Sequence, residues 1–293
     1  MVLKYFFNNK FLIIRLLTKL GFVSYNSLKY RTKFCTGNQK GGEGMGKYNV
    51  PALEKAIQIL DLISSSSEEY SVTEICKELD LPKATVFTTM STLEYYNLVQ
   101  KDHAGKFNIG PKMFQFGMAY TSNHSIIDLA KPFMNKLKDE TDFTVHLGIL
   151  HENKIMYIAK EEPDNFIKFS TYPGLRTEVH LSGLGKAIAS FLNENELKQI
   201  IKSEGMIQAT PNTITSLKDF KANIQNVHEN GYAIEDEEGE IGVRCIAAPI
   251  INARYNTPTA ISIAAHTSQL LEEDYEKVGK LVWQTAQEIA RNI

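Results

Sequence analysis

Apolar residues recur every three or four positions in the first part of the folded chain, which predicts a helix there. Its apolar face is formed by Leu53, Ala56, Ile57, Leu60 and Ile63, and four serines follow at 64–67. A second helix begins after Ser71, because Ser71 and Glu74 have the spacing of a capping box. A third helix begins at Pro82, a residue that suits a first helical turn, and ends near Tyr96. Two short helices across so tight a turn predict a helix-turn-helix.

Two short alternating segments follow, at 98–101 and 106–109, on either side of a turn that contains Gly105. This pattern predicts a β-hairpin, so we interpret residues 47–110 as a winged helix-turn-helix domain. Helical periodicity returns over 111–142, and we predict linker helices there that also pack against another chain.

The remaining part, 143–293, mixes the two periodicities and predicts a second domain. Helices are expected at 183–192, 194–203, 217–230 and 269–292, the third of them closed by Gly231. Strands are expected at 143–150, 155–160, 167–171, 243–251 and 259–265. Strands at both ends with helices between them indicate an α+β domain with a mixed or antiparallel sheet.

Composition agrees with this two-domain organisation. The chain has 293 residues, of which 43% are hydrophobic and 23% charged, as in an ordinary globular protein and unlike collagen, a coiled coil or a disordered chain. Its three cysteines, Cys35, Cys76 and Cys245, lie far apart in the sequence. This spacing predicts neither a disulfide framework nor a zinc knuckle, and it fits a protein of the reducing cytoplasm.

Charge is distributed unevenly along the chain. Residues 1–46 carry eight basic side chains and one acidic one, whereas the rest carries 24 basic and 33 acidic side chains. We interpret 1–46 as a leader outside the folded domains, either disordered or never translated. Codons for Lys40 to Glu43 can contain a ribosome-binding sequence just before Met45, which favours translation from Met45. The apolar run at 11–22 is interrupted by two basic residues and is too short to span a membrane; a targeting role stays open.

Four motifs, in this order and spacing, give the chain a specific resemblance. The chain resembles the IclR family of bacterial transcriptional regulators over about 50–293. The motifs are Leu81-Pro82-Lys83-Ala84-Thr85-Val86, Lys106-Phe107-Asn108-Ile109-Gly110, His180-Leu181-Ser182-Gly183-Leu184-Gly185-Lys186-Ala187, and Gly231-Tyr232 followed by Glu235 to Glu238 and by Gly242-Val243-Arg244-Cys245-Ile246-Ala247-Ala248-Pro249-Ile250. The resemblance implies an N-terminal winged helix that binds double-stranded operator DNA. It also implies a C-terminal, GAF-like effector-binding domain that senses a small metabolite, and a homodimer or homotetramer.

The candidate DNA-binding residues lie on the third helix, away from its apolar face, and on the wing. They are Lys83, Thr85, Phe87, Thr88, Thr89, Thr92, Lys101 and Lys106. Residues 47–110 contain six lysines, no arginine and nine acidic residues, which leaves a winged helix used only for protein contact open as an alternative. Thr88 stands where similar proteins often carry an arginine, the usual reader of guanine, so we predict an A·T-rich operator. Repression is the commoner outcome in similar proteins.

The candidate effector site is carried over from the resemblance. Gly183 and Leu184, at the start of a helix, would offer backbone N–H groups to a small carboxylate-like effector. The opposite wall would be formed by Glu235, Val243, Cys245 and Ser262. Similar proteins often have alanine at 184 and aspartate at 235, so the identity of the effector does not transfer to this chain.

Other chemistries fit the sequence less well. A phosphate-binding loop would need glycine where His180 stands. Cys245 could act as a nucleophile with His180 and Glu235, but a packed thiol is the commoner role of such a cysteine. His146 and His180 could approach each other, although no helical spacing indicates zinc. Arg176 could pair with the acidic run at 235–240 or with an acidic ligand.

From the sequence we therefore expect a cytoplasmic regulator without enzyme activity, cofactor, metal or membrane association. It would control a catabolic or metabolic operon, more often as a repressor. The alternative is a metabolite-processing or metabolite-binding protein that kept the fold.

Overall fold

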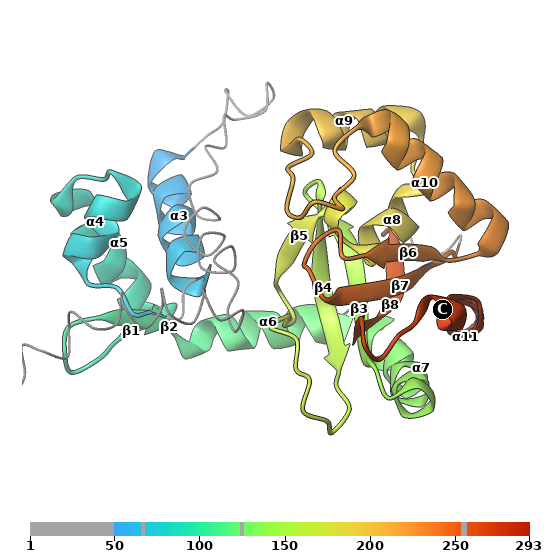
Figure 1. Ribbon diagram of the computed structural model, residues 1–293. Helices are drawn as coiled ribbons and strands as arrows, with labels where there is room; N and C mark the ends of the chain where they lie inside the picture. The colour runs from blue at the N-terminus through green and yellow to red at the C-terminus, as the bar shows by residue number, and fades with distance from the viewer. Residues whose placement is uncertain (1–49, 66–67, 124–125, 253–256) are drawn as a thin grey trace, which may run out of the picture. The chain divides into compact units, whose positions relative to one another are not determined.

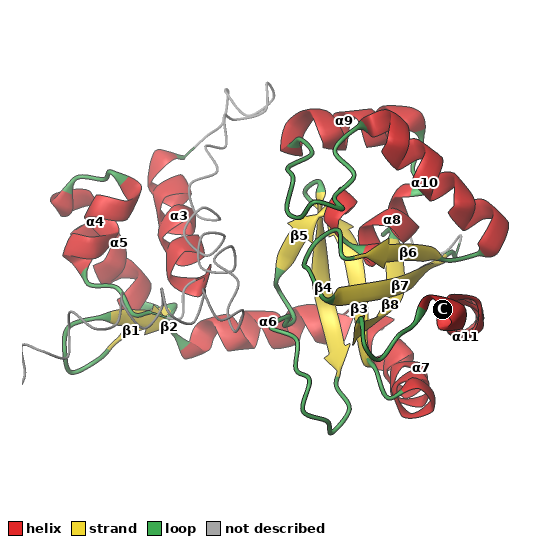
Figure 2. Cartoon of the chain, in the orientation of Figure 1, coloured by secondary structure: helices red, strands yellow, loops and turns green. Residues whose placement is uncertain are grey.

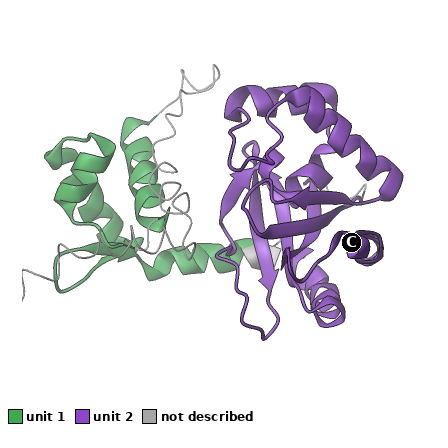
Figure 3. Cartoon of the chain, viewed as in Figure 1, with its two compact units in different colours: residues 1–120 green, residues 121–293 purple. Residues whose placement is uncertain are grey.

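The structure is a computed structural model that describes residues 50–65, 68–123, 126–252 and 257–293. The predicted leader, 1–46, lies outside the described residues. The chain divides into two compact units, 1–120 and 121–293 (Figure 3), and each is described by itself. The division falls inside the segment 111–142, which the sequence predicts to be a linker.

The described part of the first unit contains three helices, a hairpin and most of a fourth helix, in the order predicted from the sequence (Figures 1 and 2). The elements are α3 (Pro51–Ser65), α4 (Val72–Leu79), α5 (Lys83–Tyr95), β1 (Val99–Lys101), β2 (Phe107–Ile109) and, after the wing, α6 (Pro111–Asn123). Ile59, Ile75, Val86 and Phe107 are buried together and fix the helices against the wing. The winged helix-turn-helix prediction is confirmed.

Local capping signals explain where α4 and α5 begin and end. Ser71 accepts a hydrogen bond from the amide of Glu74 at 3.3 Å and donates its own amide to the Glu74 carboxylate at 2.7 Å, so the predicted capping box is present. Asp80 ends α4 in the left-handed conformation, with φ of 51°. Pro82 then precedes the first residue of α5, and this brings the two helices close across a three-residue turn.

The second unit is built around a six-stranded antiparallel sheet with the strand order β5-β4-β3-β8-β7-β6. Its strands are β3 (Thr144–His151), β4 (Lys154–Glu161), β5 (Arg176–Glu178), β6 (Ala233–Asp236), β7 (Val243–Ile250) and β8 (Thr259–His266). Its helical segments are α7 (Ile126–Thr141), η1 (Val179–Leu181), α8 (Gly183–Ala189), α9 (Glu194–Glu204), α10 (Leu217–Asn230), η2 (Glu272–Asp274) and α11 (Tyr275–Asn292). The α+β prediction is confirmed, and Gly231 closes α10 in the left-handed conformation as expected.

Helices cover both faces of this sheet (Figure 1), and each face has its own apolar core. Helices α7 and α11 pack on one face through residues such as Met134, Val282 and Ile289. Helices α8 and α10 pack on the other face through Leu184, Phe220 and neighbouring apolar residues. We call the second of these the α8 face; it carries the candidate effector site.

Several element predictions are wrong. The strand expected at 167–171 is absent, because this segment has irregular backbone whose carbonyl oxygens at Phe169 and Thr171 accept hydrogen bonds from the Lys160 ammonium, at 2.7 and 2.8 Å. Strands β5 and β6 lie where none was expected. The last helix begins at Tyr275 rather than near 269, because the 3₁₀ segment η2 precedes it.

Candidate functional site

The recognition helix α5 presents one polar and aromatic face to solvent. Its opposite face is buried through Val86, Met90 and Leu93. Of the residues predicted to contact DNA, Lys83, Phe87, Thr88 and Thr92 are exposed, and Thr85 and Thr89 are half-buried. The Phe87 ring is 60% exposed, which is unusual for so large an apolar side chain.

The hydroxyl groups along this face are bonded to the helix itself. Thr88 donates to the carbonyl of Ala84 at 2.9 Å, and Thr92 donates to the carbonyl of Thr88 at 3.0 Å. Ser91, which the sequence analysis did not single out, donates to the carbonyl of Phe87 at 2.9 Å. Its spacing of four from Phe87 and three from Thr88 places it on the same face, and this spacing was the signal that could have identified it.

The two wing lysines have different surroundings. Lys101 is exposed, with its ammonium 5.5 Å from the centroid of the Phe107 ring. Lys106 is half-buried; its ammonium donates to the carbonyl of Glu69 at 3.2 Å and lies 4.0 Å from the Glu74 carboxylate. Lys101 is therefore the more accessible of these two candidates.

In the second unit, α8 lies very close to the α8 face of the sheet. A side-chain carbon on Gly183 would stand 3.2 Å from the β-carbon of Cys245, and one on Gly148 would stand 2.8 Å from the Leu184 side chain. The absence of side chains at these two positions helps the helix and the sheet to approach closely. Leu184 is buried against the sheet, and Ser182 caps the helix by accepting a hydrogen bond from the Gly185 amide at 3.0 Å.

Strand pairing brings most of the other predicted effector residues together on this face. Glu235 and Cys245 are direct cross-strand partners. Ser262 pairs with Ala247 on one side and with His146 on the other, so on this face it lies one cross-strand row beyond the row that contains Glu235 and Cys245. Val243 lies two residues before Cys245 on β7, and side chains two apart on a strand share a face.

Glu235 is buried, and its carboxylate forms hydrogen bonds with the loop that follows it. One carboxylate oxygen accepts hydrogen bonds from the amides of Glu238 and Gly239, at 2.6 and 3.0 Å. Burial raises the pKa of Glu235 to about 7, although these two amide hydrogen bonds oppose the shift. Glu235 is therefore a carboxyl group that changes its protonation near neutral pH.

The surroundings do not activate Cys245. Burial and the nearby Glu235 carboxyl raise the pKa of the Cys245 thiol well above its ordinary value, so the thiol keeps its proton. His180, the base in the alternative catalytic interpretation, has its Nε2 atom 3.0 Å from the carbonyl of Ile207. This geometry favours a packed thiol over a nucleophile.

A second polar group on the α8 face was missed by the sequence analysis as an effector candidate. The Nε2 atom of His146 lies 2.7 Å from the Thr171 hydroxyl, and its ring contacts the Tyr157 ring with centroids 5.1 Å apart. Burial, and then the charge of Lys160, lower the pKa of His146 to about 3, so the imidazole is neutral. The strand pairing of His146 with Lys160 is the signal that, with the correct register, could have identified this group.

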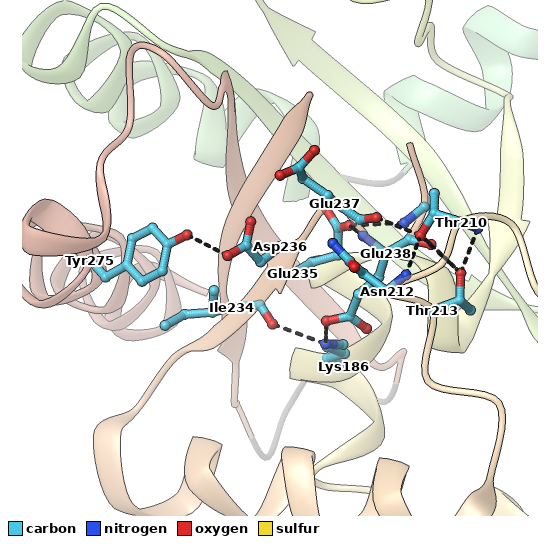
Figure 4. Close-up of polar contacts among 11 residues, drawn as sticks. Lys186, Thr210, Asn212, Thr213, Ile234, Glu235, Asp236, Glu237, Glu238 and Tyr275 are labelled. Atoms are coloured by element: carbon cyan, nitrogen blue, oxygen red, sulfur yellow. Dashed lines mark hydrogen bonds and ion pairs between the residues drawn. The ribbon is translucent and has the colours of Figure 1, made fainter. Parts of the chain in front are cut away.

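The loop 237–242 is held by the polar contacts that Figure 4 shows. The ammonium of Lys186, which is fully buried, donates to the carbonyl of Ile234 at 3.0 Å and forms an ion pair with Glu238. The hydroxyl groups of Thr210 and Thr213 donate to the carbonyls of Glu237 and Glu238, both at 2.6 Å. Acidic runs such as 235–240 are usually exposed to solvent, but Glu238 is buried here.

Two other sequence expectations concern charged groups. Arg176 bonds the Glu152 carboxylate at 2.9 Å and not the acidic run, so it forms a structural ion pair. Within the described residues, no three His, Cys, Asp or Glu side chains are grouped so that they could hold a metal ion. No helix in this same part of the chain is long and apolar enough to cross a membrane.

Comparisons with known proteins agree with both units. The model of the IclR helix-turn-helix domain matches residues 52–103, and the model of the bacterial transcriptional regulator IclR C-terminal domain matches residues 118–291. The HTH-type transcriptional repressor AllR of Escherichia coli K12 is 32% identical over 255 residues, which cover 87% of this chain and 94% of AllR.

Solved structures give the same result. The crystal structure of the Thermotoga maritima IclR is 28% identical, with a TM-score of 0.67, and covers 83% of this chain and 98% of that one. An IclR homolog from Microbacterium hydrocarbonoxydans, complexed with 4-hydroxybenzoate, has a TM-score of 0.73 at 15% identity and covers 82% of this chain and 98% of its own. At that identity the second likeness concerns the fold.

Proposed function

The chain belongs to the IclR family of bacterial transcriptional regulators, and on this premise we propose that it represses a metabolic operon until a small effector binds. It is a ligand-responsive transcriptional regulator. The observation that carries the proposal is the combination, in one chain, of an exposed recognition helix, α5, with a sheet face that buries the polar residues His146, Glu235 and Ser262 beside its apolar core. For such a protein to switch, the effector must bind the two DNA-binding arrangements with different affinity.

The proposed DNA contacts are made by the exposed face of α5 and by the wing. Lys83 and Lys101 supply the accessible positive charges, and the threonines and Phe87 supply the surface that enters the major groove. A surface without arginine favours an A·T-rich operator, because arginine is the usual bidentate reader of guanine. With so few cations in each copy, tight binding requires more than one copy on the duplex.

The proposed effector is a small carboxylate-like molecule held between the start of α8 and the sheet. Gly183 and Leu184 would supply amide groups, and Glu235, Val243, Cys245 and Ser262 would supply the wall. A Glu235 carboxyl that holds a proton near neutral pH suits a negatively charged effector, because an ionised one would repel it. A homolog with the same fold is complexed with 4-hydroxybenzoate, which is a small carboxylate.

The proposal includes a cytoplasmic location and no enzyme activity or cofactor. Known relatives are regulators rather than enzymes. The raised pKa of the Cys245 thiol also argues against a catalytic nucleophile on this face. An enzyme-like protein that kept the fold is the alternative, and turnover of small carboxylic acids would be its signature.

A gel-shift experiment on the DNA upstream of its own gene tests this function. We expect the full chain to retard that DNA in preference to unrelated DNA, with affinity that falls as salt rises. We expect a member of a panel of small carboxylates to change the retardation. Selection from random duplexes should enrich A·T-rich half-sites. Half-sites dominated by guanine would contradict the operator prediction, and equal retardation of all DNA would contradict regulation.

We also propose that the chain forms a homodimer or homotetramer, and that α6 contributes to the contact. None of the residues 111–120 is buried. They include large apolar side chains: Phe114 is 72% exposed, and Phe116, Met118 and Tyr120 are 43–54% exposed. Apolar side chains gathered on one helix are covered in most soluble proteins, and a second copy of the same helix is the simplest cover.

Replacing Phe114 with aspartate is expected to shift the chain from an oligomer toward the monomer, because the new carboxylate would be buried without a partner in the contact. The mass in solution, measured by light scattering, reports the change. Gln115→Asp adds the same charge at a polar position of α6 and is the matched control. An unchanged mass for the Phe114 variant would exclude α6 from the contact.

A further inference from the structure

The exposed face of α5 has an unusual hydrogen-bonding character. The hydroxyl hydrogens of Thr88, Ser91 and Thr92 all point to carbonyl oxygens four residues earlier in the helix. A hydroxyl bonded in this way has used its hydrogen and offers only lone pairs to a ligand. The two threonines therefore present acceptors and methyl groups, but no donor.

The rest of this face adds an apolar surface and almost no donor. Phe87 is 60% exposed and lies between Thr88 and the exposed Lys83 on the same face of the helix. Along α5, Lys83 is the one residue with a side-chain N–H group, and it stands at the first position of the helix. The central part of the recognition face is thus made of a phenyl ring, methyl groups and hydroxyl acceptors.

The major-groove edges of the bases select among these groups. Guanine presents two acceptors, N7 and O6, for which Phe87, Thr88 and Thr92 have no free donor. Thymine presents a methyl group, which an apolar surface can cover, and adenine presents an amino group, which a hydroxyl lone pair can accept. We propose that Phe87 and the methyl groups of Thr88 and Thr92 recognise the 5-methyl groups of thymine, which makes them the specificity-determining contacts. This inference rests on the proposed binding of operator DNA by α5.

Recognition of methyl groups differs from recognition of DNA shape in a way that can be measured. A·T-rich DNA can also be selected for its narrow minor groove or its flexibility, with no base contact in the major groove. Replacing thymine by uracil removes the methyl group and leaves the Watson–Crick pair and the minor-groove edge unchanged. The two explanations therefore predict different effects of this single change.

The experiment uses the full chain and a duplex that it retards specifically, taken from the selection described above. Each thymine is replaced in turn by uracil, and the affinity is measured by quantitative gel shift. We expect a loss of about fourfold at each contacted methyl, the effect of exposing one buried carbon. At such a position, 5-methylcytosine paired with guanine should bind more tightly than unmodified cytosine paired with guanine.

Protein variants assign the effect to named side chains. Thr88→Val keeps a methyl group and removes the hydroxyl, whereas Thr88→Ser keeps the hydroxyl and removes the methyl. We expect the valine variant to keep the preference for thymine over uracil and the serine variant to weaken it. Phe87→Ala should remove the preference at its own position, whereas Tyr95→Ala, at the far end of α5, should keep it. All three positions are exposed, so none of these changes is expected to unfold the domain.

The outcomes separate this inference from the proposed function. Equal affinity for thymine and uracil at every position of a specifically bound duplex would overturn methyl recognition while leaving the regulator function intact. A preference that survives in Thr88→Ser but not in Thr88→Val would also overturn it, since the hydroxyl would then be the reader. Failure to retard any duplex specifically would instead overturn DNA recognition itself.

Discussion

Replacing Lys186 with methionine is expected to lower the free energy of unfolding of the second unit by about 3–5 kcal/mol, as for other buried ion pairs that lose one partner. Lys186 is fully buried, and its ammonium is bonded to the Glu238 carboxylate and the Ile234 carbonyl. The second carboxylate oxygen of Glu238 already has no partner. Methionine has a similar length but no charge, so the variant would leave the Glu238 carboxylate buried and uncompensated.

The loss can be measured in this unit alone. The chain contains one tryptophan, Trp283, and it lies on α11, so its fluorescence during denaturation by urea reports on the second unit. Lys198→Met is the matched control, because Lys198 forms an exposed pair with Glu194 at 3.1 Å and its loss should cost less than about 1 kcal/mol.

A double variant shows whether the unpaired charge is the cause. Lys186→Met combined with Glu238→Gln removes both charges, and we expect it to recover much of the lost stability. If the double variant loses as much free energy of unfolding as the two single variants together, the loss arises from packing instead. If the urea midpoint of Lys186→Met equals that of the original chain, the ion pair contributes nothing to the free energy of unfolding.

The elements that the sequence predicts correctly are those with strong local signals. The capping box of Ser71 and Glu74, the proline before α5 and the glycine after α10 each act within a few residues. Such signals depend on hydrogen bonds and backbone angles that neighbouring residues decide. The winged helix-turn-helix is built almost wholly from them, and its order of elements follows from the sequence.

The errors occur where distant residues decide the structure. Residues 167–171 alternate like a strand, but the Lys160 ammonium takes the backbone carbonyls at Phe169 and Thr171 that a neighbouring strand would need. The short strand β6 lies in an acidic run that composition alone assigns to solvent, and it forms because it pairs with β7. Pairing partners far away in sequence are invisible to a local pattern.

The candidate effector site also combines features that the sequence predicts with features that it does not. Strand pairing brings Glu235, Cys245 and Ser262, which the resemblance implies as effector residues, to one face of the sheet. The burial of Lys186 could not be read from its sequence, since lysine is almost never fully buried without a partner and Glu238 lies 52 residues away. Neighbouring residues on β6 point to opposite faces of the sheet. Glu235 bonds to its own loop, whereas Asp236 accepts a hydrogen bond from Tyr275 on α11, at 3.0 Å (Figure 4).

Replacing Glu235 with glutamine is expected to change how the stability of the second unit depends on pH. Burial raises the pKa of Glu235 in the folded chain to about 7, above the ordinary value of 4.5. Between these two values the folded chain holds a proton that the unfolded chain has lost, so the free energy of unfolding falls as pH rises through this window. The full fall is about 3 kcal/mol and is complete above the folded-state pKa.

Glutamine cannot ionise but keeps an oxygen that can accept the amides of Glu238 and Gly239. The variant should therefore lack this fall and be more stable than the original chain at about pH 8, with the two converging toward about pH 5. Urea denaturation followed by Trp283 fluorescence at several pH values measures the difference. Glu194→Gln is the control, because Lys221 and Lys198 lower the pKa of exposed Glu194 to about 2, outside this window. Parallel curves for the original chain and the Glu235 variant would show that Glu235 is ionised throughout, and would remove the reason for matching it with a negatively charged effector.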